Sequence, residues 1–214
     1  MARDFESVGA LYDRWAGHRW TYELMTRAAF FGRRERLRRA AVSSLRLRPG
    51  DTVLDLACGP GADLELLGSA VGPTGRIVAI DASAEMLERA RQRGEELGLE
   101  CSLELRRADL AEAELGAACA DGALIALALS ALPDRLAALR RIRAALRPGA
   151  SLAVVDTLPF TGAARPLNRL AGPPFRAVTN WDYEADLVAD LRATFGSVEA
   201  RRYNAGSALL ATAH

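Results

Sequence analysis

The sequence predicts an α/β fold in which a seven-stranded, mostly parallel sheet is covered by helices on both faces and ends in an antiparallel hairpin. Three observations support this. From residue 52 to residue 156, short apolar runs alternate with helical patterns, which is typical of a parallel sheet. The first run ends in a small-residue turn, 57–61, that leads into a helix. From residue 197 onward the pattern changes to two strands around the turn 204–206.

Each strand is expected where a run of apolar residues is bounded by turn residues. The strand runs are 52–57, 77–81, 102–106, 122–129, 151–156, 197–203 and 207–213. The helical patterns are 62–70, 84–97, 135–146 and 184–195, with a short helical turn near 111–115. Pro148 and Gly149 directly follow the third helix and end it, because proline cannot continue a helix and glycine favours its end.

Two regions lie outside this alternation. Residues 1–48 combine aromatic residues with eleven arginines and are expected to form two or three amphipathic helices, an N-terminal cap on a single domain at 49–214. Residues 157–182 contain four prolines and no periodicity, which predicts a loop, and loops of this length are usually functional. Ligands of such sheets lie beyond the carboxyl ends of the strands. The cap and the loop are therefore the expected lid and substrate walls.

The turn after the first strand is the strongest functional signal. Residues 53–61 read Val-Leu-Asp-Leu-Ala-Cys-Gly-Pro-Gly and lead into a helix, so free backbone N–H groups would face a ligand there. Gly59 and Gly61 matter because a Cβ would hold a nucleotide-like ligand away from the main chain. The alternative is a tight turn between a strand and a helix with no ligand at all.

A second carboxylate strengthens the ligand hypothesis. Asp81 ends the next apolar run, about 20 residues after the glycine turn, where an acidic residue accepts hydrogen bonds from ribose hydroxyls. Its charge would also repel a 2′-phosphate. The alternative is that Asp81 caps the following helix. Ser83 can provide that cap instead, so the ribose role is favoured.

Five separated motifs carry a family resemblance. In order and spacing, residues 55–61, 81, 108–109, 121–133 and 146–149 resemble those of the class I S-adenosylmethionine-dependent methyltransferases, which share a Rossmann-like fold. A dinucleotide dehydrogenase would more typically have Gly-x-Gly-x-x-Gly, and the third glycine is missing here. Ala57 departs from the family, which often has glycine at this position, and predicts a tighter pocket.

The resemblance implies S-adenosylmethionine as the cofactor. It places Asp55 and the turn 59–61 around the methionine moiety, Asp81 on the ribose and Asp109 on the adenine amino group. The full set of expected cofactor residues is Asp55, Ala57, Gly59, Pro60, Gly61, Asp81, Ala82, Met86, Ala108, Asp109, Leu110 and Leu127.

Composition excludes several other functions. The net charge of +1 argues against a nucleic-acid partner. The sequence contains no lysine, which excludes catalysis by a lysine side chain. Three cysteines without metal-ligand spacing and two histidines predict no protein-held metal. No signal peptide is visible, and the apolar stretch 122–132 is about half of the length that spans a bilayer. A reduced, cytoplasmic protein is expected.

The acceptor side is expected to be apolar. Residues 127–134 should line the methyl end of the pocket and are aliphatic apart from Ser130, which favours a hydrophobic acceptor, although a plain core strand is the alternative. The expected substrate residues are Trp15, Trp20, Ser130, Trp181 and Tyr203. Candidates for a general base are His18, Tyr22 and Tyr12. His18 could equally be a packing or surface residue.

Shorter resemblances concern the acceptor. Residues 12–18 and 22–25 resemble the start of quinone-ring C-methyltransferases, whereas residues 15–16, 30–33 and 129–133 are similar to N-methyltransferases of betaine-lipid or phospholipid head groups. Both imply methyl transfer to a small or medium hydrophobic acceptor. Non-methylating use of the cofactor and a non-catalytic cofactor-binding partner stay open. The clustered Arg33, Arg34, Arg36, Arg38 and Arg39 fit either peripheral contact with an anionic membrane or a solvated helix face.

Overall fold

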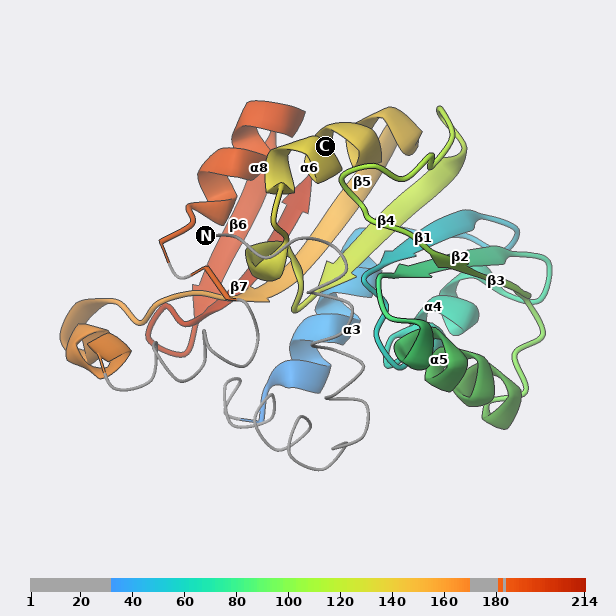
Figure 1. Ribbon diagram of the computed structural model, residues 1–214, viewed down its shortest axis with the longest axis horizontal. Helices are drawn as coiled ribbons and strands as arrows, with labels where there is room; N and C mark the ends of the chain where they lie inside the picture. Colours follow the sequence, from blue (N-terminus) through green and yellow to red (C-terminus); the bar gives the residue numbers. More distant parts are fainter. Residues whose placement is uncertain (1–31, 170–180, 183) are drawn as a thin grey trace.

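The seven-stranded sheet that the sequence predicts is confirmed. A computed structural model describes residues 32–169, 181–182 and 184–214 (Figure 1). Its sheet has the order β3-β2-β1-β4-β5-β7-β6. The strands are β1 (Thr52–Leu56), β2 (Arg76–Asp81), β3 (Ser102–Arg107), β4 (Ala120–Ala126), β5 (Leu146–Thr157), β6 (Val198–Tyr203) and β7 (Ala208–Ala213).

The register brings the carboxyl ends of the central strands to one edge. β1 pairs in parallel with β2 and with β4, and Leu56 lies opposite both Ile80 and Ile125. The next pair, β4 and β5, is also parallel, whereas β7 runs antiparallel to both β5 and β6. The strand order reverses between β1 and β4, and ligands of open α/β sheets bind at such a point.

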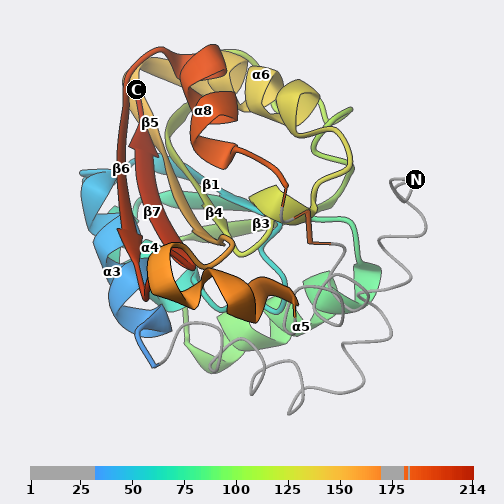
Figure 2. The ribbon, with the colours of Figure 1, turned by 90° about the vertical axis from the view of Figure 1, so that its left-hand side faces the viewer.

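Helices cover both faces. α6 (Arg135–Ala145) and α8 (Leu187–Phe195) lie on one side of the sheet, and α3 (Arg34–Ser44), α4 (Leu64–Val71) and α5 (Ala84–Glu96) lie on the other (Figures 1 and 2). Side chains of β1 alternate between the two cores, as a strand requires. Leu54 and Leu56 pack with the α6 and α8 side, and Val53 packs with the α3 side.

Several element boundaries differ from the prediction. The short helical turn predicted near 111–115 is present but begins earlier, since the N–H groups of Glu112 and Ala113 both donate to the carbonyl of Asp109. β4 ends at Ala126 instead of continuing to 129, because Leu127 has a φ of 63° and cannot extend a strand. The 3₁₀-helix η1 (Leu129–Ala131) follows. α8 begins at Leu187 instead of 184, because the side chain of Asp186 accepts a hydrogen bond from the backbone N–H of Ala189 and caps it.

The described part of the N-terminal region packs into the core. Leu37 and Ala41 of α3 are buried, as is its C-cap residue Leu45, and the hydroxyls of Ser44 and Thr212 are 2.9 Å apart. Residues 1–31, with the rest of the predicted cap, lie outside the described residues. The division at residue 48 stays a prediction.

The segment 157–182 is described only in part. Its first portion contains the 3₁₀-helix η2 (Gly162–Leu167), where the sequence predicted only a loop. The side chain of Asn168 closes this portion, since it bonds both the N–H and the carbonyl of Phe160. Among the described helices, none has the length and apolar character to cross a membrane.

Candidate functional site

A cleft opens where the strand order reverses. It lies at the carboxyl ends of β1, β2 and β4, and we refer to it as the strand-edge cleft. Its lining residues are Ala57, Gly59, Pro60, Asp81, Ala82, Met86, Ala108, Asp109, Leu110, Ala126, Leu127, Ala128, Ala131, Leu132 and Pro133. The fold therefore brings together all but two of the expected cofactor residues. The exceptions are Asp55, which lies beneath the turn, and Gly61.

The two glycines of the turn serve different purposes. Both have positive φ, 54° at Gly59 and 75° at Gly61. A Cβ on Gly59 would meet no atom within 4 Å, so the space above this residue is open to a ligand. On Gly61 it would come within 2.6 Å of the Leu64 side chain and 3.1 Å of the Ala90 backbone. Close packing of α4 and α5 therefore explains Gly61, in place of the expected ligand approach.

Asp81 anchors the glycine turn. One carboxylate oxygen, Oδ2, accepts the backbone N–H of Gly59 at 2.8 Å, and Oδ1 accepts the N–H of Ser83 at 2.9 Å. The cap of α5 comes from Ser83, whose hydroxyl accepts the N–H of Met86 at 3.0 Å. The alternative that Asp81 caps this helix is thus wrong. Its carboxylate lies in the lining of the cleft.

Asp109 lies in the same cleft, two residues after β3, the strand that pairs with β2. Its Oδ1 accepts the backbone N–H of Ala111 at 2.8 Å, a local turn that orients the side chain. Ala108 and Leu110 flank it in the lining. Asp81 and Asp109 therefore line one cleft, although they come from different strands.

A second, more polar hollow adjoins the first and lies among α3, α4 and α5. We call it the polar hollow. It shares Gly59, Pro60 and Leu127 with the strand-edge cleft and adds Arg38 and Asp63. Nε of Arg38 and Oδ1 of Asp63 form a buried ion pair at 2.6 Å.

Asp55 lies beside this ion pair, near the end of β1. It is 1% exposed, and Arg38 is 4% exposed. Within the described part of the chain, Oδ2 of Asp55 and Nη2 of Arg38 have no hydrogen-bond partner. Burial raises the pKa of the Asp55 carboxyl well above its usual range, and repulsion from Asp63 adds to this effect while Arg38 opposes it. Burial also raises the pKa of Asp63 despite its ion pair.

The inward orientation of Arg38 was missed by the sequence reasoning, which placed it in one exposed arginine cluster. A signal was present. Arg38, Ala41 and Val42 follow a spacing of three and four residues and lie on the buried face of α3, which the C-cap residue Leu45 continues. Its neighbour Arg39 is exposed and pairs with Glu35 at 3.1 Å.

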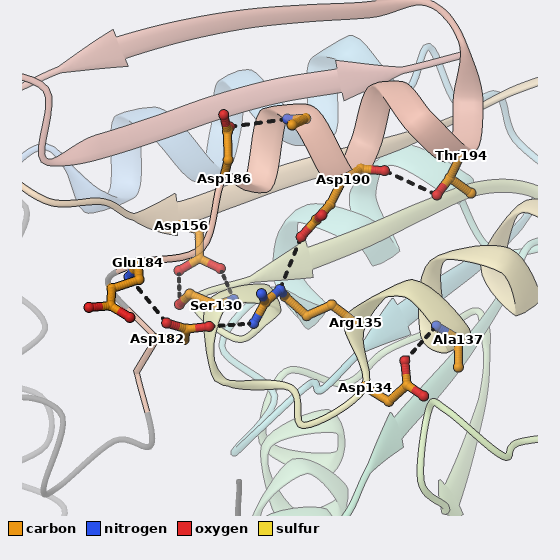
Figure 3. Close-up of polar contacts among 11 residues, drawn as sticks. Ser130, Asp134, Arg135, Ala137, Asp156, Asp182, Glu184, Asp186, Asp190 and Thr194 are labelled. Carbon is orange, nitrogen blue, oxygen red and sulfur yellow. Dashed lines mark hydrogen bonds and ion pairs between the residues drawn. The ribbon is translucent and has the colours of Figure 1, made fainter. Parts of the chain in front are cut away.

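The turn after β4 is fixed by a buried carboxylate (Figure 3). Asp156 is 0% exposed and accepts the N–H of Ser130 at 2.9 Å, its hydroxyl at 2.8 Å and the N–H of Thr157 at 2.7 Å. Burial raises the pKa of Asp156 to about 6, and these hydrogen bonds oppose the shift. Ser130 is itself buried, so its hydroxyl is committed to Asp156 and offers no free donor to an acceptor molecule.

The same turn holds the returning end of the segment 157–182 (Figure 3). The carbonyl of Ser130 accepts the N–H of Asp182 at 3.0 Å, and Arg135 bonds Asp182 at 3.1 Å and Asp190 at 3.2 Å. Nε1 of the buried Trp181 donates to the carbonyl of Thr157 at 3.3 Å. Both ends of the segment therefore meet beside the turn after β4.

The remaining expected site residues are placed only in part. Tyr203 of β6 pairs with Ala208 of β7, which in turn pairs with Thr157 of β5. Tyr203 is therefore at the same sheet edge as the cleft, but β5 and β7 separate it from β4. Tyr12, Trp15, His18, Trp20 and Tyr22 lie outside the described residues. Among the residues that are described, no group of three His, Cys, Asp or Glu side chains could hold a metal ion.

The strand order and the cleft agree with a comparison of the sequence with known families. A family model described as a methyltransferase domain matches residues 53–149. Residues 53–149 thus match the methyltransferase-domain family, and the fold is that of S-adenosylmethionine-dependent methyltransferases. Among class I methyltransferases of known structure, a SAM-dependent methyltransferase from Aquifex aeolicus is similar with a TM-score of 0.63 and 23% identity, covering 82% of this chain and 87% of the other.

Named relatives within this family act on quinones. The chain is 30% identical to a 2-phytyl-1,4-naphtoquinone methyltransferase of Synechococcus elongatus over 71% of its own length and 64% of the relative. It is also 30% identical to a ubiquinone/menaquinone biosynthesis C-methyltransferase of Pseudomonas syringae pv. syringae, over 83% of its own length and 63% of the relative. The chain thus spans less than two thirds of the length of these relatives.

Ala57 lies within the matched methyltransferase domain and has an unusual backbone conformation. Ala57 has a φ of 51°, a conformation that costs an L-residue about 1–2 kcal/mol and glycine almost nothing. A glycine, which the resemblance predicts at this position, would adopt this conformation without strain. The chain keeps the conformation with alanine, whose methyl group lines the cleft.

Proposed function

We propose that this chain binds S-adenosylmethionine in the strand-edge cleft and transfers its methyl group to a small or medium hydrophobic acceptor of quinol or phenol type. The observation that carries the proposal is the cleft itself. It joins the glycine turn, Asp81 and Asp109 at the point where the strand order reverses. The quinone methyltransferases among the relatives support the choice of acceptor class.

The residues present fit the cofactor. Asp81 would accept the ribose hydroxyls while holding the N–H of Gly59, and Asp109 would accept the adenine amino group. The open space above Gly59 lets a ligand approach the main chain. The unpartnered Oδ2 of Asp55 and Nη2 of Arg38 would receive the ammonium and carboxylate of the methionine end.

The protein's contribution to the reaction is orientation. When bound, the cofactor supplies an electrophilic methyl group, so rate depends mainly on aligning the acceptor with it. The wall at that end is formed by Leu127, Ala128, Ala131, Leu132 and Pro133. Since the hydroxyl of Ser130 is bonded to Asp156, we propose a positioning role for Ser130 instead of a contact with the acceptor. A polar acceptor would leave its groups unpaired at about 1–3 kcal/mol each.

The roles of His18, Tyr22, Tyr12, Trp15 and Trp20 in proton removal and acceptor binding stay predictions, as does membrane contact. Each lies in the part of the chain that the structure does not describe. Of the three substrate candidates that the structure describes, Ser130, Trp181 and Tyr203, Trp181 is buried and would act by anchoring the segment 157–182.

A product assay tests this proposal. Purified protein is incubated with S-adenosylmethionine and a panel of naphthoquinols, phenols, amines and phospholipids, and products are identified by mass spectrometry. We expect adenosylhomocysteine together with a methylated quinol or phenol. If methylthioadenosine is the product instead, the chain transfers the aminocarboxypropyl group and not the methyl group. Cofactor binding without any product would favour a non-catalytic cofactor-binding protein.

A further inference from the structure

Two buried atoms without partners belong to Arg38, which lines the polar hollow, and to Asp55, which interacts with Arg38. Nη2 of Arg38 and Oδ2 of Asp55 are buried, and neither has a hydrogen-bond partner in the described part of the chain. They come from different elements, α3 and β1, so their proximity is a product of the fold. Buried polar groups are normally paired. A donor and an acceptor left over at one place fit a ligand that carries both an anionic and a cationic group.

The charges of this cluster do not balance when all its groups are ionised. Asp55 and Asp63 face the guanidinium of Arg38, which already bonds Asp63 at 2.6 Å. Arg34 and Glu35 of α3 also act on Asp63, but their charges are opposite and together they add no net counter-charge. The other ionisable groups that act on Asp55 are Asp81 on β2, whose negative charge adds repulsion, and the thiol of Cys58. A buried charge without a counter-charge costs several kcal/mol, and a carboxylate in that position takes up a proton instead.

We infer that the Asp55–Asp63 pair holds one proton in the cofactor-free protein, and that the cofactor's ammonium group displaces this proton to solvent while Arg38 receives the cofactor's carboxylate. The inference rests on the proposed cofactor site. It makes Arg38 and Asp63, which lie outside the strand–turn motif, specificity-determining residues for the amino-acid end of the ligand.

The charge balance gives the direction of the pH effect. The ammonium group supplies the counter-charge that Asp55 lacks, so the proton is no longer needed. Because binding releases a proton, affinity rises with pH while the pair is protonated, by up to about tenfold per pH unit. Asp55 and Asp63 interact, so the proton belongs to the pair and not to either residue.

Calorimetry measures the proton directly. Adenosylhomocysteine is titrated into the whole chain between about pH 5.5 and pH 7, where its own α-amino group stays charged, in buffers of different ionisation enthalpy. The slope of observed enthalpy against buffer enthalpy should show release on the order of one proton per ligand at the most favourable pH. 5′-Methylthioadenosine, which lacks the amino-acid end, should show none.

Two matched variants locate the effect. Arg38→Gln should lower the affinity for adenosylhomocysteine at least tenfold, because a charged hydrogen bond to its carboxylate is lost. The affinity for methylthioadenosine, which has no carboxylate, should stay within about twofold. Arg39→Gln, at the exposed neighbouring position on the same helix, should change the affinity for neither ligand. Asp55→Asn should abolish proton release.

The outcomes are separable. Adenosylhomocysteine that binds with the same enthalpy in every buffer throughout this pH range would overturn the inference and leave the proposed function standing. Equal proton release by methylthioadenosine would also overturn it, since the proton would then come from the adenosine end. Absence of any adenosylhomocysteine binding would remove the proposed function itself. The comparison of two ligands on the unmodified chain decides between these outcomes even if a variant fails to fold.

Discussion

The carboxylate of Asp81 and the backbone N–H of Gly59 are joined by a hydrogen bond of 2.8 Å between residues 22 positions apart. This bond connects the end of β2 to the turn that follows β1. The residue proposed to hold the ribose therefore also fixes the turn over which the ligand lies. Loss of Asp81 should affect the site in two ways.

Asp81→Asn should weaken adenosylhomocysteine about 5-fold to 150-fold, since a carboxylate contact and an anchor of the turn are worth about 1–3 kcal/mol. Isothermal titration measures the change. The matched control is Asp186→Asn, at the N-terminus of α8 and outside the cleft lining, where asparagine can still accept the N–H of Ala189, so affinity should not change and thermal stability should change little. Unchanged affinity in the Asp81 variant would contradict the ribose role.

The two turn glycines should respond differently to alanine. Gly61→Ala should lower the free energy of unfolding by about 2–4 kcal/mol, because its Cβ would collide with Leu64 and Ala90. Gly59→Ala should cost only about 1–2 kcal/mol of backbone strain, but it should weaken adenosylhomocysteine several-fold. Denaturant unfolding and titration of both variants provide the measurement. The idea fails if Gly59→Ala binds as tightly as the wild type.

Ala57 should tolerate glycine and reject valine. Ala57→Gly relieves strain at a φ of 51° but adds freedom to the unfolded chain, so stability should change by less than about 1 kcal/mol. Ala57→Val places a β-branched side chain in the same conformation and should cost about 2 kcal/mol or more. Urea unfolding compares the two. A valine variant of wild-type stability would show that the positive φ is not required.

Asp156 should leave a pH signature in stability. Its pKa, about 6 in the folded chain, lies above the unfolded value, so the folded state binds the proton more tightly. The bound proton stabilises the folded state at low pH, and this stabilisation is lost as the pH rises through about 6. Between about pH 5 and pH 7.5 the wild type should lose about 1.4 kcal/mol relative to Asp156→Asn, which does not titrate.

Denaturant unfolding of both proteins at the two pH values isolates this effect, because Asp55 and Asp63 titrate in both and cancel in the difference. A stability difference independent of pH would mean that Asp156 has an ordinary pKa. A difference of the opposite sign would mean that its hydrogen bonds to Ser130 and Thr157 outweigh burial.

The predictable parts of this fold have local signals. Strands β1 and β2 follow from apolar runs, and the cleft follows from small residues and carboxylates placed directly after them. These signals involve residues close in the sequence. Ser83 as the cap of α5 is of the same kind, because a cap bonds a backbone N–H three residues away.

The parts that could not be predicted depend on contacts between distant residues. β4 ends at Ala126 because Leu127 adopts positive φ, with its N–H bonded to the carbonyl of Val155 at 2.7 Å. The hydroxyl of Ser130 is taken up by Asp156, 26 residues later. Arg38 turns inward to Asp63, 25 residues later. No short-range pattern specifies such pairs, so the sequence reasoning counted Ser130 as free and Arg38 as exposed.

A crystal structure of the chain with adenosylhomocysteine tests the central claim most directly. The account predicts ribose hydroxyls within hydrogen-bond distance of Asp81, the adenine amino group at Asp109, and the amino-acid end between Asp55 and Arg38. A ligand bound elsewhere, or an amino-acid end that points away from Arg38 into solvent, would contradict it.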